Sequence, residues 1–472
     1  MTRLPRPPES FFDGTPPPVR AYIEQLHTII DQLMALVETH EVRIAELEAQ
    51  LKQNSSNSSK PPSSDGPHVK PAPPRLPSGK KRGAQPGHPK HERTLLPPDE
   101  THDHKPARCS RCCTTLAGDD PDPLVDQVID LPVKLRHVIH HRRHTLTCPH
   151  CQAATTAAPV PGLRSGFGPA LTAATAYLSG VGRLGKRSIR ILFGDLFDIP
   201  MALGSVSKLE AKVSAALAPI HAEALQHTQG QAANVDETGW TENKHKAWLW
   251  VAVTPFLTAF LIRPNRNRAA FDDLVGPTPG ILTTDRYSVY THLAAGQRQV
   301  CWAHLRRDFQ AMIDRNNDGS IIGEHLLLHA DLLFDHWPKV RDGTRTRNWF
   351  QRRYGTLLRD EVRLHLERGT RCRCAVTARV CRDLLAVEAS LWTFAAAAGI
   401  EPTNNAAERA VRHAVCWRKT SFGTDSERGS RFVERLLTVV ASCRSQGRGV
   451  LEFLRQALTH TTGQPSLLPT AA

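Results

Sequence analysis

The stretch NVDETGW, residues 234–240, places an aspartate, Asp236, at the end of an apolar run. Two later stretches carry further acids in different local settings. In ILTTDRYSVY, Asp285 ends a strand-like segment, and in TNNAAERAVR, Glu408 lies near the start of a helix-like segment. Carboxylate oxygens are the ligands that Mg²⁺ prefers in proteins. The three stretches therefore predict that two strands and one helix bring three acidic ligands to a common site.

The residues around these acids predict an α/β core over residues 230–425. QAANVDE, KAWLWVAVT and LTAFLIRP have the composition of three consecutive strands, RAAFDDLV that of a helix, and ILTTD and RQVC that of two further strands. Three antiparallel strands, a crossover helix and parallel strands follow the order of a ribonuclease-H-like fold. In that order Asp236 and Asp285 end neighbouring strands. Residues 310–400, mainly helical, form an insertion before the helix of Glu408.

An acidic trio in this arrangement suits phosphoryl transfer with two divalent metal ions. Mg²⁺ or Mn²⁺ held by Asp236, Asp285 and Glu408 would activate the attacking oxygen and stabilise the leaving one. Cys301 and His304 form a CxxH directly after the fifth strand and could bind a metal or pack near the site. Because two ligands alone do not make a metal site, packing is the favoured interpretation.

Composition narrows the range of partners. The chain has 472 residues and a formal net charge of +14, which favours a polyanionic partner, with nucleic acid first and an acidic membrane surface second. No stretch approaches the roughly 20 apolar residues of a membrane span, and MTRLPRPPESFF at the N-terminus lacks the apolar region of a signal peptide. Eleven cysteines in a chain of this length favour reduced thiols and metal binding. We therefore expect a cytoplasmic, nucleoid-associated protein with no membrane partner.

A heptad pattern over residues 20–52 predicts a coiled coil. β-Branched residues at a and Leu at d favour a parallel two-stranded arrangement. An amphipathic helix packed on its own chain would need a broader apolar stripe, so we expect a homodimer or a higher oligomer. The a positions are Ile23, Ile30, Val37, Ile44 and Leu51, and the d positions are Leu26, Leu33, His40 and Leu47.

Two segments are predicted to be disordered, residues 1–19 and the basic linker of residues 53–104, where Ser, Pro, Gly and Lys dominate. Basic residues in the linker and after the third acid are candidates for contact with DNA phosphates. A solvated tether and a solvated helix face are the alternatives. The candidates are Lys80, Lys81 and Arg82 in the linker, and Arg409, Arg412, Arg418 and Lys419 after Glu408.

Residues 105–160 are predicted to form a zinc-ribbon-like domain. Cys109 and Cys112 form one CxxC pair, Cys148 and Cys151 form a second, and the residues between them alternate as in a hairpin. Two such pairs suit tetrahedral ligation of one structural Zn²⁺, although the gap is wider than in the usual ribbon. A redox role is the weaker alternative because neither pair opens a helix in a βαβ unit.

The remaining segments are predicted to be helical. Residues 161–229 contain LFGDLFDIPMALGSVSKLEAKV, which has the pattern of a helix-turn-helix that would place its second helix in a DNA major groove. An ordinary helical hairpin explains the pattern equally well. Residues 426–472 are expected to form C-terminal helices and a tail. The whole chain is thus predicted to be a multidomain α+β protein.

Several motifs, taken in order, resemble those of insertion-sequence transposases of the IS-sixty-six type. They are the N-terminal heptads, NSSNSSKPPSSD, GAQPGH, the paired CxxC, VDETGW, TTDRYSVY, CWAHLRRDF, NNAAERAVR and SFGTDSERGSR. The resemblance covers nearly the whole chain. It implies a transposase of the DDE class, with Asp236, Asp285 and Glu408 as metal ligands. It also implies cleavage at the element's terminal inverted repeats, joining of the freed 3′ ends to target DNA, and possible helper proteins encoded by the element.

Two other functions remain open from the sequence. A catalytically inactive DNA-binding regulator derived from such a transposase would keep the zipper, the zinc ribbon and the helix-turn-helix on a decayed core. The presence of all three acids favours the enzyme. An RNA-cleaving ribonuclease H is disfavoured by the long front half, which has the features of a DNA-binding region.

Overall fold

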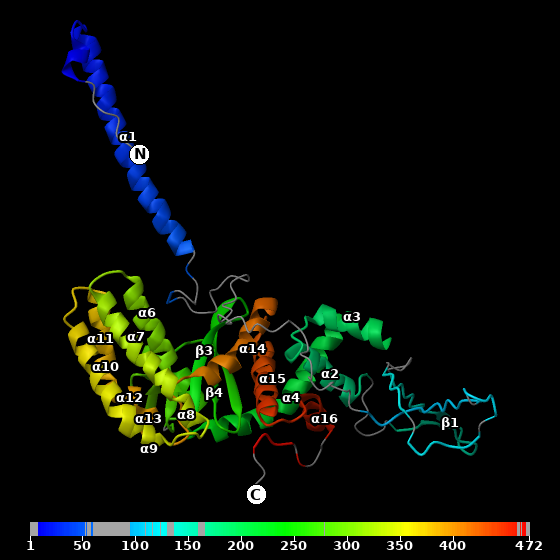
Figure 1. Ribbon diagram of the computed structural model, residues 1–472. Coiled ribbons are helices and arrows are strands. Elements are labelled where there is room, and N and C mark those ends of the chain that lie inside the picture. Colours follow the sequence, from blue (N-terminus) through cyan, green and yellow to red (C-terminus); the bar gives the residue numbers. More distant parts are fainter. Residues whose placement is uncertain are drawn as a thin grey trace. The chain divides into compact units, whose positions relative to one another are not determined.

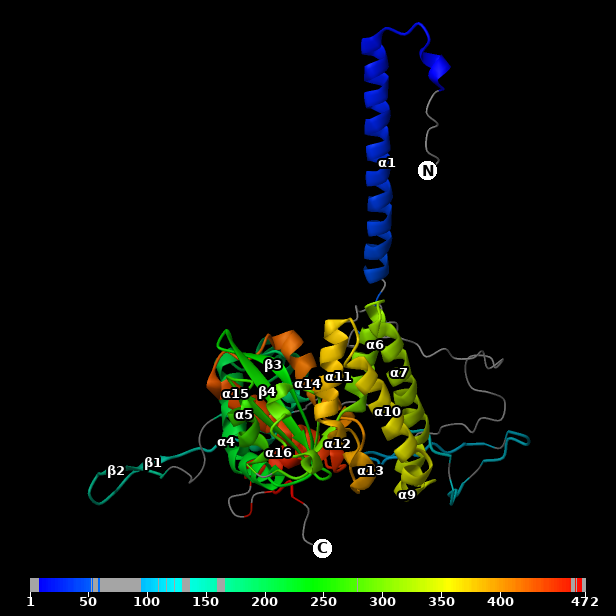
Figure 2. The same cartoon turned by 90° about the vertical axis from the view of Figure 1, so that its left-hand side faces the viewer.

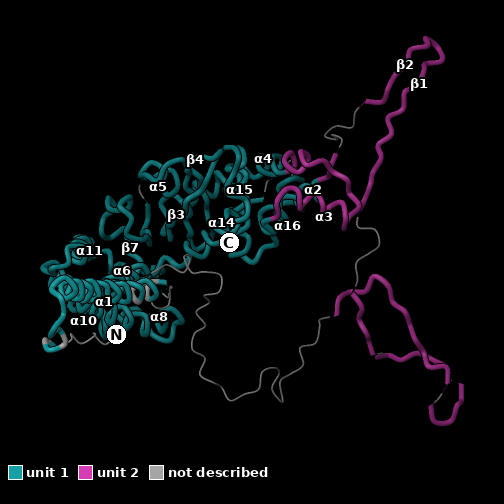
Figure 3. Tube along the Cα trace, turned by 90° about the horizontal axis from the view of Figure 1, so that it is seen from above, with its two compact units in different colours: residues 1–71, 169–183, 210–472 teal, residues 72–168, 184–209 magenta. Residues whose placement is uncertain are grey.

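The computed structural model describes residues 8–51, 53, 58–59, 95–108, 110–115, 117–122, 124–129, 136–158, 166–277, 279–459, 463 and 465–468. The chain divides into two compact units (Figure 3). The larger unit comprises residues 1–71, 169–183 and 210–472, and the smaller unit comprises residues 72–168 and 184–209. No helix in the described part of the chain is both long and apolar enough to span a bilayer.

A mixed five-stranded sheet forms the framework of the larger unit (Figures 1 and 2). Its strand order is β5-β4-β3-β6-β7, with antiparallel pairing from β5 to β3 and parallel pairing from β3 to β7. The strands expected from the sequence are thus present in the expected order, with helix α5 between β5 and β6. The bounds are β3 Ala233–Glu242, β4 His245–Val253, β5 Thr258–Arg263, α5 Arg268–Val275, β6 Leu282–Thr284 and β7 Arg298–Val300.

One expectation about β3 is wrong, because Asp236 lies in the middle of this strand and does not end it. The parallel pairing of β3 with β6 stops at the pair Asn234–Thr283. β3 nevertheless continues to Glu242 because its other edge remains paired with β4, where Asp236 lies opposite Val251. Asp236 therefore still lies where β6 ends.

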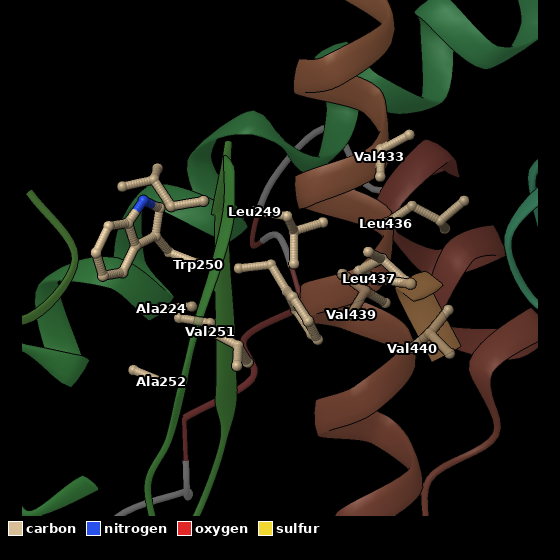
Figure 4. Packing of buried hydrophobic residues seen from close by; sticks show 14 of the residues in the cluster. Ala224, Leu249, Trp250, Val251, Ala252, Val433, Leu436, Leu437, Val439 and Val440 are labelled. Carbon is tan, nitrogen blue, oxygen red and sulfur yellow. The ribbon is translucent and has the colours of Figure 1, made fainter. Parts of the chain in front are cut away.

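Three C-terminal helices of the chain pack with this sheet into one hydrophobic core. They are α14 (Asn405–Ser421), α15 (Glu427–Ser445) and α16 (Val450–Thr459). Figure 4 shows Leu249 of β4 turned toward Leu437 of α15, whereas Trp250 points to the other side of the strand. Leu249 and Trp250 are both fully buried. Burial of both faces explains why β4 and β5 are nearly continuous apolar runs with no polar alternation.

Helix α15 also hydrogen-bonds the outer edge of β5. An edge strand presents unpaired N–H groups at every second residue. Alternate strand residues are about 6.7 Å apart, and residues four apart in a helix are about 6 Å apart along its axis, so polar side chains at that spacing can meet successive edge amides. The three bonds run from Thr258 N to Ser442 Oγ (3.0 Å), from Phe260 N to Thr438 Oγ1 (3.0 Å) and from Ile262 N to Glu434 Oε2 (2.9 Å).

The helical insertion expected between strand five and Glu408 is present and has its own hydrophobic core. Large aromatic residues dominate this second core, among them Trp302, Trp337, Phe350 and Phe394. The elements are α6 Trp302–Asp314, α7 Gly319–His336, α8 Pro338–Arg341, α9 Arg347–Phe350, the π-helix η5 Gln351–Gly355, α10 Thr356–Gly369, α11 Ala375–Ala386, α12 Glu388–Leu391 and α13 Thr393–Ala396.

Helix α1 (Pro17–Leu51) occupies the segment predicted as a coiled coil. It begins at Pro17, inside the segment of residues 1–19 that was expected to be disordered. Proline is well suited to the first turn of a helix, which agrees with this starting point. The short 3-10 helix η1 (Glu9–Phe12) precedes it, so the expectation of disorder is wrong for these residues, and residues 1–7 lie outside the described part. On α1 the seam residues Leu33 and Val37 are 54% and 40% exposed in the single chain.

Strands β1 (Thr145–Thr147) and β2 (Ala154–Thr156) form an antiparallel hairpin in the smaller unit. The hairpin was expected between the two CxxC pairs, and that expectation is wrong for residues 124–129 and 136–144, which carry no strand. The second CxxC itself closes the hairpin, because Cys148 N donates to Ala153 O at 2.9 Å.

The helix, turn and helix predicted for residues 192–213 are present. They correspond to α3 (Lys186–Phe197) and the start of α4 (Leu203–Thr228), and α2 (Pro169–Gly180) precedes them. Asp198, in the left-handed conformation that ends many helices, terminates α3.

Candidate active site

The first two acids lie side by side at the end of the parallel pairing. Asn234 of β3 is paired with Thr283 of β6, and Asp236 and Asp285 each lie two residues beyond that pair. Asp236 Oδ1 accepts the backbone amide of Glu237 at 2.9 Å, and Asp285 Oδ1 accepts that of Tyr287 at 2.8 Å. Both carboxyl groups are therefore oriented by their own chain, as a preformed ligand site requires.

The charges of Asp285 and Glu408 both act on the pKa of Asp236, which indicates that the three acids lie near one another. Burial, and after it the negative charges of Glu237, Asp285 and Glu408, together raise the pKa of this carboxyl from 3.8 to about 8. A cation placed among these acids would remove this penalty. The site is therefore built for a positive ligand.

Glu408 lies in the first turn of α14, as the sequence predicts. Its Oε1 atom is buried and accepts no hydrogen bond among the described residues. The nearest charged groups are His304 Nδ1 at 3.4 Å and Arg307 at 3.7 Å, both on α6. An acceptor left without a hydrogen bond, next to the acids around Asp236, suits a metal ligand.

Asn404, immediately before α14, connects the three parts of the site. Its buried side chain donates from Nδ2 to Val235 O at 2.7 Å, one residue from Asp236, and its backbone amide donates to Cys301 Sγ at 3.1 Å. Its carbonyl accepts the amide of Glu408. Sequence reasoning recognised only a polar start to this helix and missed that Asn404 joins α14 to β3.

The CxxH pair lies near the site, as the sequence suggested. One ligand atom from each of Cys301, His304 and Glu408 lies within 4.8 Å of the others. Cys301 is fully buried, and burial raises the pKa of its thiol to about 11. A protonated thiol that accepts an amide hydrogen bond agrees with the packing role favoured for Cys301. His304 instead lies beside Glu408, where it can orient that carboxylate.

A second layer of polar residues supports the aspartates from behind. Glu237 is buried, pairs with Arg266 through its Oε1 atom, and accepts the hydroxyl of Tyr290 at Oε2. The guanidinium of Arg266 lies 3.6 Å from the ring centroid of Tyr287 and 4.8 Å from that of Trp248. Both carboxylate oxygens of Glu237 are thus engaged in the protein interior, so Asp236 is the better candidate ligand of the pair.

Two arginines hold the chain around Asp285. Arg298 of β7 is buried and donates to the carbonyl of Asp285 at 2.9 Å and to Thr284 Oγ1 at 3.2 Å. Arg286 pairs with Asp308 of α6 at 2.8 Å. The second acid is therefore fixed between β6, β7 and α6.

The basic candidates after Glu408 have different environments. Arg409, Arg412 and Lys419 are exposed on α14. Arg418 is half-buried and donates to Gly239 O and to Thr238 Oγ1 of β3, so its guanidinium binds within the fold and is not free for DNA. Lys80, Lys81 and Arg82 lie outside the described residues.

Three of the four predicted zinc ligands are described. Cys112 and Cys151 are exposed and Cys148 is half-buried, whereas Cys109 lies outside the described residues. Backbone amides of Cys151 and His150 donate to the Cys148 thiol and lower its pKa. Amide bonds to sulfur favour the thiolate form that zinc requires. Among the described residues, however, the sulfur atoms of Cys112, Cys148 and Cys151 do not all lie within 4.8 Å of one another, so the structure does not bring these three predicted ligands together.

The structure thus contains the arrangement expected for a transposase core. This arrangement is a mixed sheet, two aspartates at adjacent strands and a glutamate on a covering helix. Residues 164–431 match the family model described as Transposase IS66 family. Since this match covers more than half of the chain, the protein belongs to the IS66 family of transposases. Residues 14–94 match a further family of unknown function.

A curated relative shares part of the chain. Over 234 residues the protein is 25% identical to y4qI, an uncharacterized protein of Sinorhizobium fredii. The match covers 45% of this chain and 43% of that relative, so it spans less than half of either protein.

Proposed function

We propose that the protein is a DNA transposase that binds the terminal inverted repeats of an insertion sequence and catalyses metal-dependent cleavage and strand transfer on a ribonuclease-H-like core. The observation that supports this most is the convergence of the acids. Asp236 and Asp285 occupy matching positions beyond paired strands, and the charge of Glu408 raises the pKa of Asp236. Membership of the IS66 family supports the same conclusion.

The residues present suit two divalent cations. Asp236, Asp285 and Glu408 would hold Mg²⁺ or Mn²⁺, since all three offer hard oxygen ligands and Glu408 Oε1 accepts no hydrogen bond within the described part. When bound, such ions lower the pKa of an attacking hydroxyl and neutralise charge on the leaving oxygen. Arg409, Arg412 and Lys419, exposed on the same helix as Glu408, would contact DNA phosphates.

The front half of the chain would supply DNA binding and assembly. We assign a structural Zn²⁺ to Cys109, Cys112, Cys148 and Cys151, and DNA contact to the linker residues Lys80, Lys81 and Arg82 and to helices α3 and α4. Helix α1 would pair two protomers so that both element ends are held together. The double-stranded ends and target DNA are then the partners, with possible helper proteins, in the cytoplasm at the nucleoid.

A strand-transfer assay tests the enzyme directly. The substrate is the DNA flanking the gene, which should contain the inverted repeats, and the cofactor is Mg²⁺ or Mn²⁺. Asp236→Asn, Asp285→Asn and Glu408→Gln each remove one anionic ligand with little change in shape, so each should abolish cleavage but leave DNA binding intact. Asp383→Asn, which alters an exposed acid of the insertion, is the matched control and should remain active.

The outcomes separate the enzyme from a regulator. If the wild-type protein binds the element ends but does not cleave them, although the assay itself works, the result favours a DNA-binding regulator. Near-normal cleavage by any one of the three variants would remove that residue from the metal site.

A further inference from the structure

A cluster of basic residues lies in the helical insertion, far in sequence from the three acids. Helix α8, helix α9 and the π-helix η5 follow one another between Trp337 and Gly355. This segment contains six basic residues and one acidic residue. In both Figure 1 and Figure 2, α9 lies at the lower end of the insertion and α6 at its upper end. We call the five exposed cations of this segment the insertion patch: Lys339, Arg341, Arg345, Arg352 and Arg353.

The patch cations have no acidic partners, in contrast to several other arginines of the insertion. Three exposed arginines elsewhere in the insertion are paired: Arg306 with Asp331 at 2.6 Å, Arg359 with Glu388 at 2.8 Å and Arg363 with Glu367 at 2.9 Å. Four others are exposed and in no ion pair with a described residue: Arg368, Arg371, Arg379 and Arg382. Throughout the described range 279–459, no ion pair includes any of the five patch cations. Acidic partners therefore offset part of the positive charge elsewhere in the insertion, whereas no ion pair offsets the charge of the patch cations.

The one acidic residue of the segment does not neutralise the patch. Asp342 Oδ1 accepts the backbone amide of Thr344 at 2.9 Å, so this carboxylate is used to shape the turn after α8. Asp342 offsets one of the six positive charges of the segment, which therefore keeps an excess of five.

The base of the patch is rigid. Tyr354 stacks on His336 with ring centroids 3.9 Å apart and meets Trp349 edge-on at 5.5 Å. Below them Arg347, the sixth basic residue, donates to the carbonyls of Phe394 and Ile400. The patch cations thus lie next to packed aromatic side chains. This packing reduces the conformational entropy that the cations lose when they bind a ligand.

The surface between the cations is shaped to receive an anion. An open depression of about 380 Å³ is lined by Thr346, Asn348, Trp349, Arg352 and Arg353. Two guanidinium groups, a hydroxyl and an amide are the groups that bind phosphate oxygens. The five-residue π-helix carries Arg352 and Arg353, and π-helical turns are frequent at functional sites.

We propose that the insertion patch is a second DNA-binding surface, which holds the phosphate backbone of duplex DNA away from the acidic site. This rests on the proposed function for the identity of the polyanion. A lipid surface is the poorer partner, because between Trp337 and Gly355 no large hydrophobic side chain is exposed for insertion into a membrane. Contacts of this kind position the duplex and carry no sequence information.

The test measures binding of the full-length protein to a labelled duplex of unrelated sequence by fluorescence anisotropy between about 50 and 200 mM salt. The triple variant Arg345→Ala, Arg352→Ala, Arg353→Ala removes three patch cations. The matched control, Arg306→Ala, Arg359→Ala, Arg363→Ala, removes three exposed arginines of the same insertion that are paired with acids. Both variants change the net charge equally, and a thermal melt confirms that both remain folded.

The patch variant should bind at least about tenfold more weakly at 100 mM salt. The slope of log K against log salt should fall by about 3, because each removed cation neutralises about one phosphate. The control should stay within about twofold of wild type. Equal behaviour of the two triple variants would overturn the proposal.

Two further outcomes separate the possible partners and the two proposals. A second set of measurements uses vesicles with anionic headgroups in place of the duplex. Binding to the vesicles that depends on the patch, with no such binding to the duplex, would also overturn the proposal. The assay needs no cleavage, so a protein that fails the strand-transfer assay yet shows the patch effect would refute the enzyme and leave the patch standing.

Discussion

At the residue scale, the buried carboxyl of Asp236 makes the metal-free protein sensitive to pH. Its pKa is raised from 3.8 to about 8 by burial and neighbouring acids. Between those values the folded state binds more protons than the unfolded state, so this residue lowers stability as pH rises. Without metal, Asp236→Asn should therefore stabilise the protein at pH 8 by on the order of 5 kcal/mol, since one pKa unit corresponds to about 1.4 kcal/mol, and the gain should shrink toward pH 4.

Urea unfolding of wild type and variant across this pH range, with EDTA present, measures the effect. Asp383→Asn is the control and should follow wild type. Adding Mg²⁺ or Mn²⁺ should raise wild-type stability most at high pH and have little effect on the variant. If the free energy of unfolding of variant and wild type changes with pH in the same way, Asp236 keeps an ordinary pKa.

Asn404 offers a second prediction at this scale, because it ties the helix of Glu408 to the strand of Asp236. Asn404→Ala removes the bond to Val235 O inside the core, which should cost about 1–3 kcal/mol. The misplaced Glu408 should weaken Mn²⁺ binding about tenfold or more, as loss of outer-shell partners does. Asn405→Ala changes the neighbouring exposed asparagine and should leave both quantities close to wild type. Titration calorimetry with Mn²⁺ checks this, and unchanged affinity in Asn404→Ala would contradict a positioning role.

At the scale of elements, α15 protects the edge of the sheet with side chains in place of a further strand. Thr438 Oγ1 accepts Phe260 N and donates to Glu434 O. Thr438→Val keeps the shape but leaves a buried edge amide without an acceptor, so unfolding free energy should fall by about 1–3 kcal/mol. Thr175→Val removes another fully buried helical hydroxyl, one bonded only to Leu171 O, and should cost less. If urea unfolding shows that both variants lose a similar free energy of unfolding, the bond to the edge of β5 stabilises the protein no more than an ordinary buried hydroxyl does.

The cysteine hairpin is the other element whose role can be measured. Cys148→Ser should abolish binding of about one Zn²⁺ per chain, since a structural site needs all of its thiolates. The hairpin β1–β2 should lose order with it, because ligation supplies folding energy to small metal domains. Cys113→Ser removes an exposed thiol beside the first pair and should retain the metal. Elemental analysis of freshly purified, reduced protein decides this, and a zinc-free wild type would refute the assignment.

At the scale of the whole molecule, α1 predicts the oligomeric state. Its seam residues Leu33 and Val37 are largely exposed in the single chain, and a partner copy would cover them. Leu33→Asp together with Val37→Asp would bury charge in that seam, so the double variant should become monomeric. Thr28→Asp together with Ala35→Asp places the same charges on exposed positions of the opposite face and should leave the dimer intact. Light scattering at micromolar concentration measures both, and a monomeric wild type would refute pairing through α1.

The sequence by itself determined the elements and the three acids. Strand and helix periodicity depend on neighbouring residues, so the order of β3, β4, β5, α5, β6 and β7 was predictable. Asp285 and Glu408 lie where their local motifs placed them, directly after β6 and in the first turn of α14. The heptads likewise predicted α1, because a repeat of seven residues is a property of one segment alone.

Only the tertiary structure decided what the buried polar groups bind. Asn404 meets a carbonyl 169 positions earlier, and Thr438 meets an edge amide 178 positions earlier. Arg418, which by its sequence was a candidate for phosphate contact, binds Thr238 180 positions away. The partner of a polar side chain depends on which distant elements pack together. Hydrophobic periodicity is a local property and does not contain this information. For the same reason the sequence found the three acids, whereas the residues that hold those acids in place required the fold.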